Sequence, residues 1–140
     1  MTHNIPGGNR MEVRFDIRQE KDIIVAAEAV REHAEAAGFS TVKQYTLATA
    51  VSELATNIFF YADHGSIRMK MLETGNRRGI EICAKDNGPG IVDLDLALED
   101  DYSTSGGLGV GLPGTRRLVD EFEIKSGPGR GTRVIIRKWL

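Results

Sequence analysis

Three clusters of polar and glycine residues, in a fixed order along the chain, constrain its fold more than any other feature. The first is a carboxylate and an amide four residues apart, Glu53 and Asn57, inside a long and mostly apolar segment. The second is the run 86–90, Asp-Asn-Gly-Pro-Gly, and the third is the run 106–111, Gly-Gly-Leu-Gly-Val-Gly. Because glycine runs do not continue regular structure, the fold has to combine one polar helix patch with two glycine-rich loops.

Alternating apolar and charged residues predict the strands. Residues 11–17 alternate from Met11 to Ile17, and residues 67–71 and 80–84 alternate on either side of a turn at 73–79. This period of two is typical of a strand with one buried face, so the last two segments predict an antiparallel hairpin that ends at Asp86. Residues 122–126 and 132–138 predict a second hairpin around the turn at 127–131.

Helical periodicity predicts two long helices in the first half of the chain. The first covers residues 22–37 and ends at Gly38. Its predicted buried stripe is Ile24, Ala27, Val30 and Ala34. The second is capped by Ser40 or Thr41 and runs to about Tyr61, and its apolar composition predicts that much of its circumference is covered.

The second half of the chain predicts shorter helices. A short helix is expected over 94–99, a mobile loop over 100–109, and a last helix that has Pro113 in its first turn and reaches residue 120 or 121. The whole pattern predicts an α+β fold, a two-layer sandwich of a mixed β-sheet with helices on one face. Residues 1–10 are expected to form a flexible N-terminal tail and residues 11–140 one domain.

Composition excludes several classes of function. The net charge is −2 and no basic block is present, so we expect no nucleic-acid partner. No apolar run approaches the ~20 residues of a membrane helix, and the first ten residues contain no signal core. The lone Cys83 lies in a predicted strand and is expected to be a buried thiol. We therefore expect a soluble, cytoplasmic protein without a membrane partner.

The first cluster fits phosphate chemistry. Residues four apart lie on one helix face, so Glu53 and Asn57 are expected to project together. A magnesium ion on nucleotide phosphates needs only one or two protein oxygens, which Asn57 can provide, and Glu53 could then orient or deprotonate a nucleophile. The alternative is a pair of solvated polar residues, but the apolar flanking residues leave little polar face for them.

The second cluster fits recognition of a flat base. A carboxylate at a strand end, Asp86, can accept a hydrogen bond from an exocyclic amine, while Gly88 and Gly90 allow the backbone to approach a ring. The alternative is an ordinary turn, since Asp-Asn-Gly-Pro-Gly is also good turn chemistry.

The third cluster contains a misleading motif. Residues 109–114 satisfy G-x-G-x-x-G, but the dinucleotide fingerprint needs a buried strand directly before it, and residues 101–107 cannot form one. A P-loop is excluded because no G-x-x-x-x-G-K-[ST] is present. What remains is a glycine-rich loop that leads into a helix N-terminus, where backbone N–H groups favour phosphate.

Together these residues resemble the GHKL ATPases, which share the Bergerat fold. Glu53-x-x-x-Asn57 resembles their N box, the two glycine clusters resemble their glycine boxes, and Gly131-Thr132 resembles their last glycine-threonine element. The resemblance covers residues 11–140. The runs 52–55, 60–62, 102–113 and 138–140 narrow it to RsbT-type serine/threonine kinases of the stressosome.

The resemblance implies a role for each site residue. Glu53 would be the catalytic base, Asn57 the Mg²⁺ ligand at the ATP phosphates, and Asp86 the adenine anchor in a pocket shaped by Gly88 and Gly90. Thr132 would lie by the adenine. The hinge and phosphate cradle of the ATP lid would be formed by Gly107, Gly109, Val110 and Gly111. The lid has no lysine or arginine between residues 103 and 112, which leaves phosphate charge to Mg²⁺ and backbone donors.

Three functions are compatible with such a site. The first is a kinase that transfers the γ-phosphoryl group of ATP to STAS-domain proteins of a stressosome-like complex and then activates a PP2C-type phosphatase. The second is a non-catalytic ATP-binding anti-sigma or partner-switching module, which would not need Glu53. The third, a histidine kinase catalytic domain, is disfavoured because His3, His33 and His64 lack an acceptor context.

Overall fold

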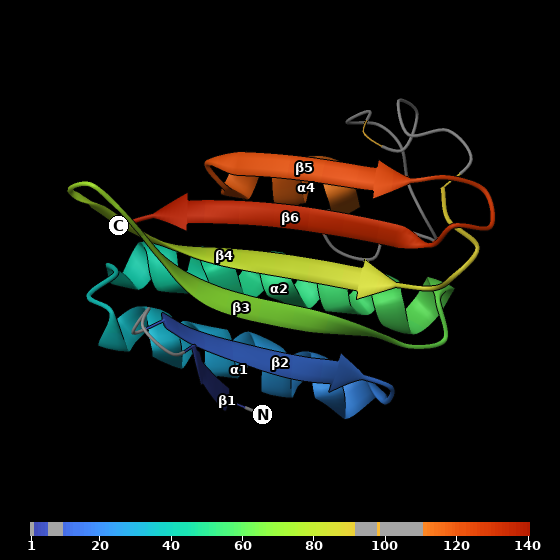
Figure 1. Cartoon of the computed structure of the whole chain (residues 1–140). Helices are drawn as coiled ribbons and strands as arrows, with labels where there is room; N and C mark the ends of the chain where they lie inside the picture. Colours follow the sequence, from blue (N-terminus) through green and yellow to red (C-terminus); the bar gives the residue numbers. More distant parts are fainter. Residues whose placement is uncertain (1, 6–9, 92–97, 99–110) are drawn as a thin grey trace.

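The computed structural model describes residues 2–5, 10–91, 98 and 111–140. Its helices all lie on one face of a single sheet (Figure 1), which confirms the α+β two-layer architecture. The described elements, in chain order, are β1 (Thr2–Ile5), β2 (Arg10–Ile17), α1 (Glu20–Ala36), α2 (Thr41–Tyr61), β3 (Gly65–Thr74), β4 (Arg77–Asp86), α4 (Gly111–Leu118), β5 (Glu121–Ser126) and β6 (Thr132–Trp139).

The sheet has the strand order β1-β2-β3-β4-β6-β5, and every strand pair among the described residues is antiparallel. The prediction of a mixed sheet was therefore wrong in this respect. A parallel pair would have formed if β5 lay directly beside β4, which runs in the same direction. Instead β6, the hairpin partner of β5, lies between them (Figure 1).

The N-terminal segment also differs from the prediction. Thr2–Ile5 pairs with Arg10–Ile17 as an edge strand, where a flexible tail over residues 1–10 was expected. Strand pairing at a sheet edge is made by backbone groups, so it needs no apolar alternation that the sequence could display. The domain boundary at residue 11 remains a proposal.

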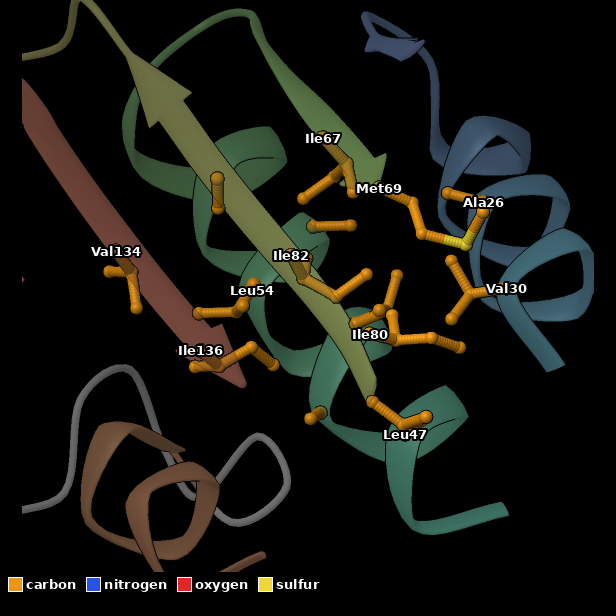
Figure 2. Close-up of a cluster of buried hydrophobic side chains, with 14 of the residues drawn as sticks. Ala26, Val30, Leu47, Leu54, Ile67, Met69, Ile80, Ile82, Val134 and Ile136 are labelled. Carbon is orange, nitrogen blue, oxygen red and sulfur yellow. The ribbon is translucent and has the colours of Figure 1, made fainter. Parts of the chain in front are cut away.

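The core lies between the sheet and the helices. Isoleucine, valine and methionine side chains of β3, β4 and β6 point toward α1 and α2 and meet apolar side chains of these helices (Figure 2). Among the largest fully buried side chains are Leu47, Ile67, Met69, Ile80, Ile82 and Ile136. This core fixes which face of each strand is buried and therefore the register of the sheet.

The two long helices follow their local signals, except at the start of the buried stripe of α1. Ser40 caps α2 by accepting a hydrogen bond from the Lys43 N–H at 3.3 Å, as predicted. The buried residues of α1 are Ile23, Ala26, Val30 and Ala34, whereas the predicted Ile24 is 72% exposed and the predicted Ala27 is only half-buried. The periodicity of a helix leaves such a one-residue rotation open when both positions are isoleucine. No helix in the described part of the chain is long and apolar enough to cross a membrane.

Both predicted hairpins are present. The first turns at Gly75 and Asn76, inside the predicted segment 73–79, and the second joins β5 to β6 around residues 127–131. Cys83 lies on β4 but is only half-buried, and this burial raises the pKa of its thiol. The helix predicted over 94–99 and the loop predicted over 100–109 lie outside the described residues, apart from Leu98.

Candidate functional site

A row of four residues crosses the sheet at the end of strand β4. Gly65 pairs with Asp86, Asp86 pairs with Thr132, and Thr132 pairs with Ser126. Alternate residues of a strand share a face. This row therefore lies on the same side of the sheet as the apolar residues that stand two positions further into each strand. Those residues are Ile67, Ala84, Val134 and Ile124. The apolar face under the helices therefore ends in a polar edge, which we call the polar row: Asp86, Thr132 and Ser126.

Asp86 is held at this edge as a hydrogen-bond acceptor. Its Oδ1 accepts from the Gly88 N–H at 2.9 Å, which closes a tight turn directly after β4. Burial raises the pKa of Asp86 from its ordinary value, and the backbone N–H groups of Gly88 and Thr132 partly offset this effect. A half-buried carboxylate at a strand end is suited to accept hydrogen bonds from a ligand amine.

The loop after β4 and the β5–β6 turn interlock. The Gly129 N–H donates to the Pro89 carbonyl at 2.7 Å, and a Cβ added at Gly90 would overlap the Gly127 carbonyl oxygen. Gly131 has φ +73°, and a Cβ there would overlap the Asp86 carbonyl oxygen. Glycine is required at these positions because two backbones pass each other with no room for a side chain.

The C-terminal end of α2 lies against the same edge. A Cβ on Gly65 would come within 2.9 Å of Ile58 Cγ2, and one on Gly88 within 2.7 Å of Ala62 Cβ. Asn57 precedes Ile58 directly, so its backbone belongs to the helical turn that approaches Asp86. The structure thus brings the end of α2, the helix that carries Glu53 and Asn57, to the predicted base pocket.

Glu53 and Asn57 are both half-buried on α2, between buried apolar neighbours such as Leu54 and Ile58. Among the described residues, no hydrogen bond or ion pair joins either side chain to Asp86. Helix α4 packs against α2 and begins at Gly111, which has φ +63°. The remaining predicted cradle residues, Gly107, Gly109 and Val110, lie outside the described residues.

Sequence reasoning missed Ser126. Its hydroxyl accepts from the Ile91 N–H at 2.7 Å and donates to the Gly131 carbonyl at 2.9 Å, so it connects three segments around the polar row. The signal was available in principle, because the predicted hairpin register pairs residue 126 with Thr132. A lone serine at the end of a strand nevertheless carries no motif of its own.

The close approach at Gly131 leads to a stability prediction with a matched control. Gly129 and Gly131 have almost the same backbone angle, φ +74° and +73°, but a Cβ at Gly129 meets nothing within 4 Å. Gly129→Ala should cost only the left-handed conformation, about 1–2 kcal/mol. Gly131→Ala should cost about 1–3 kcal/mol more from overpacking. Urea unfolding of both variants measures the difference, and equal costs would contradict the interlocking of the two loops.

A metal ion that is held by protein side chains alone needs several ligands close together. No group of three or more histidine, cysteine, aspartate or glutamate side chains that could hold a metal occurs in the described ranges. A nucleotide-borne Mg²⁺ does not need such a cage, since phosphates and water supply most ligands and one amide oxygen suffices. The half-buried Asn57 fits this requirement.

A strand-end carboxylate beside interlocked glycine turns, with a polar helix face approaching it, is the arrangement of a nucleotide-binding domain. The model of the family described as the histidine kinase-like ATPase domain matches residues 16–138, and the chain belongs to this family. The matched range contains the entire polar row as well as Glu53 and Asn57, and the match confirms the predicted GHKL resemblance.

Individual relatives narrow the comparison. The chain is 47% identical to the serine/threonine-protein kinase RsbT of Bacillus subtilis (strain 168) over 124 residues, covering 89% of this chain and 93% of that protein. It is 30% identical to an anti-sigma F factor of Thermoanaerobacter sp. (strain X514), covering 94% of each. The crystal structure of the SiaB–SiaC complex from Pseudomonas aeruginosa is similar in fold, with TM-score 0.51, 13% identity and coverage of 91% and 89%.

Proposed function

We propose that this chain is an ATP-dependent serine/threonine protein kinase that phosphorylates a regulatory protein in a partner-switching pathway. The observation that carries the proposal is the 47% identity to a serine/threonine-protein kinase across 93% of that kinase's length. The carboxylate of Glu53, on the helix next to the proposed base pocket, supports this function, because a phosphotransfer enzyme uses such a group and a pure binding module does not need one.

The site residues would contact two parts of the nucleotide, the base and the phosphates. Asp86 would accept a hydrogen bond from the adenine amine, and Gly88, Gly90 and Thr132 would shape the base pocket around it. The backbone of Gly107, Gly109, Val110 and Gly111 would contact the phosphates. The α4 N-terminus at Gly111 would add the favourable end of the helix dipole.

At the phosphates, Glu53 would orient and deprotonate the acceptor hydroxyl. Asn57 would supply one oxygen ligand to Mg²⁺ carried by the nucleotide. When bound, that ion would neutralise part of the charge that develops on the transferred phosphoryl group.

The acceptor would be a protein rather than a metabolite. Relatives of the RsbT type imply STAS-domain proteins of a stressosome-like complex as substrates and a PP2C-type phosphatase as the protein activated afterwards. The acceptor hydroxyl would then arrive on a docked protein surface beside Glu53.

The second candidate is a non-catalytic ATP-binding anti-sigma module, favoured by 30% identity to anti-sigma F factors over 94% of their length. The two functions are separated by incubating the protein with labelled ATP, Mg²⁺ and a set of purified candidate STAS-domain proteins. The kinase predicts label on a serine or threonine of one of them. Nucleotide binding without label on any of them would favour the binding module.

We also expect phosphorylation to release the partner. The new phosphate carries about −2 charge and would lie beside the product nucleotide, where like charges repel. The unmodified partner should therefore bind clearly more tightly than the phosphorylated one. Surface plasmon resonance with the two forms measures this ratio. Equal affinities would contradict a release switch while leaving phosphotransfer itself unaffected.

A further inference from the structure

Two hydroxyl groups of the polar row, those of Ser126 and Thr132, lie within hydrogen-bond distance of each other, and the donor of this bond follows from their other contacts. A serine hydroxyl has one proton to donate and two lone pairs to accept with. Ser126 Oγ lies 2.7 Å from the Ile91 nitrogen, 2.9 Å from the Gly131 carbonyl oxygen and 2.8 Å from Thr132 Oγ1. The nitrogen can only donate and the carbonyl can only accept, so the single proton of Ser126 is directed to Gly131.

This leaves one arrangement for Thr132. Because the Ser126 proton is already used, the contact between the two hydroxyls requires Thr132 to donate to Ser126. The hydroxyl of Thr132 then has no proton left for any other group. Toward a ligand it can only accept.

Asp86, like Thr132, can only accept hydrogen bonds from a ligand. It neighbours Thr132 directly across strands β4 and β6, and cross-strand neighbours on one face have Cβ atoms about 4.5–5.5 Å apart. An ionised carboxylate has no proton to donate. The pocket edge therefore presents two adjacent acceptors and no side-chain donor from this pair.

We propose that Ser126 is a positioning residue for base specificity, which fixes Thr132 as an acceptor so that the pocket selects a base with an amine at position 6 over one with a carbonyl there. The inference rests on the ATP binding in the proposed function but not on phosphotransfer. A 6-amine offers hydrogens to both acceptors, whereas a 6-carbonyl would face two acceptors and lose its hydrogen bonds.

The test compares the binding of two nucleotides, ATP and ITP, which differ only in the base at position 6 and in the protonation of N1. In the wild type, ATP should bind clearly more tightly than ITP. In Ser126→Ala the Thr132 hydroxyl is free to rotate and donate to a 6-carbonyl. The ratio of ATP to ITP affinity should then fall by about three- to tenfold, the range of one hydrogen bond. Titration calorimetry on the full chain gives both affinities, and thermal unfolding shows that the variant is folded.

Controls separate positioning from a merely structural role. If Ser126 only holds the backbone at Ile91 against the β5–β6 hairpin, Ser126→Ala should lower the affinities for ATP and ITP by the same factor. An unchanged ratio of the two affinities would overturn the proposal. Ser126→Thr keeps the hydroxyl and should keep the wild-type ratio. If Ser126→Ala does not fold, Thr132→Val tests the same acceptor and should also lower the ratio.

The outcome is distinguishable from failure of the proposed function. Because the readout is binding, the inference holds equally for a kinase and for a binding module. Wild-type protein that binds ATP and ITP equally would overturn it even if phosphotransfer occurs. Wild-type protein that binds neither nucleotide would overturn both.

Discussion

Replacing Glu53 with alanine is expected to lower phosphotransfer by ~10²-fold or more, the usual scale for loss of a general base. Nucleotide affinity should change little, because Glu53 is proposed to act on the acceptor hydroxyl and not on ATP. Alanine is also the best helix former, so α2 should remain intact around the half-buried position. Single-turnover transfer from labelled ATP to the partner measures the rate, and calorimetry measures the affinity.

Asn57→Ala is the matched control, one helical turn away on the same face. It should weaken Mg²⁺-dependent ATP binding itself, because the proposed ligand oxygen is lost. Glu53→Gln keeps the size of the side chain but not its basicity, and it should be as inactive as Glu53→Ala. Equal loss of ATP affinity in the Glu53 and Asn57 variants would contradict the division of roles between them.

The sequence was sufficient where local signals agree with tertiary packing. The cap at Ser40 and the apolar run to Tyr61 predicted the bounds of α2, and alternation predicted β3 and β4 within a few residues. It was insufficient where the decision is tertiary. Whether Ile23 or Ile24 faces the sheet depends on how α1 rotates against its neighbours. The strand order that places β6 beside β4 cannot be read from alternation either.

The candidate site was likewise predictable from the sequence only in part. The glycine spacing pointed to Gly88 and Gly90, and the structure brings them to Asp86 and Thr132 at one edge of the sheet. Ser126 was missed because its importance comes from the register of the β5–β6 hairpin, which brings its hydroxyl within 2.8 Å of Thr132. Register is a property of paired strands and not of one strand's composition.

Asp86→Asn is expected to lower ATP affinity by ~10²-fold while leaving the fold intact at neutral pH. The amide oxygen would stay on the Gly88 N–H, so the amide NH2 would face the adenine amine and two donors would oppose each other. Wild-type protein should correspondingly prefer ATP over GTP, whose carbonyl would oppose the carboxylate. Competition calorimetry measures both, and comparable affinities of the wild type for ATP and GTP would contradict the role of Asp86.

The stability of Asp86→Asn relative to wild type should depend on pH with a definite sign. Burial raises the pKa of Asp86 in the folded protein. The contribution of this carboxyl to stability is therefore complete below its unfolded pKa and is lost as pH rises through the folded pKa. Asparagine does not titrate, so the free energy of unfolding of Asp86→Asn relative to wild type should increase from acid to neutral pH. Urea unfolding across this range tests the sign. A relative decrease would show that the ionised carboxylate stabilises the fold, in which case loss of ATP binding could not be assigned to recognition alone.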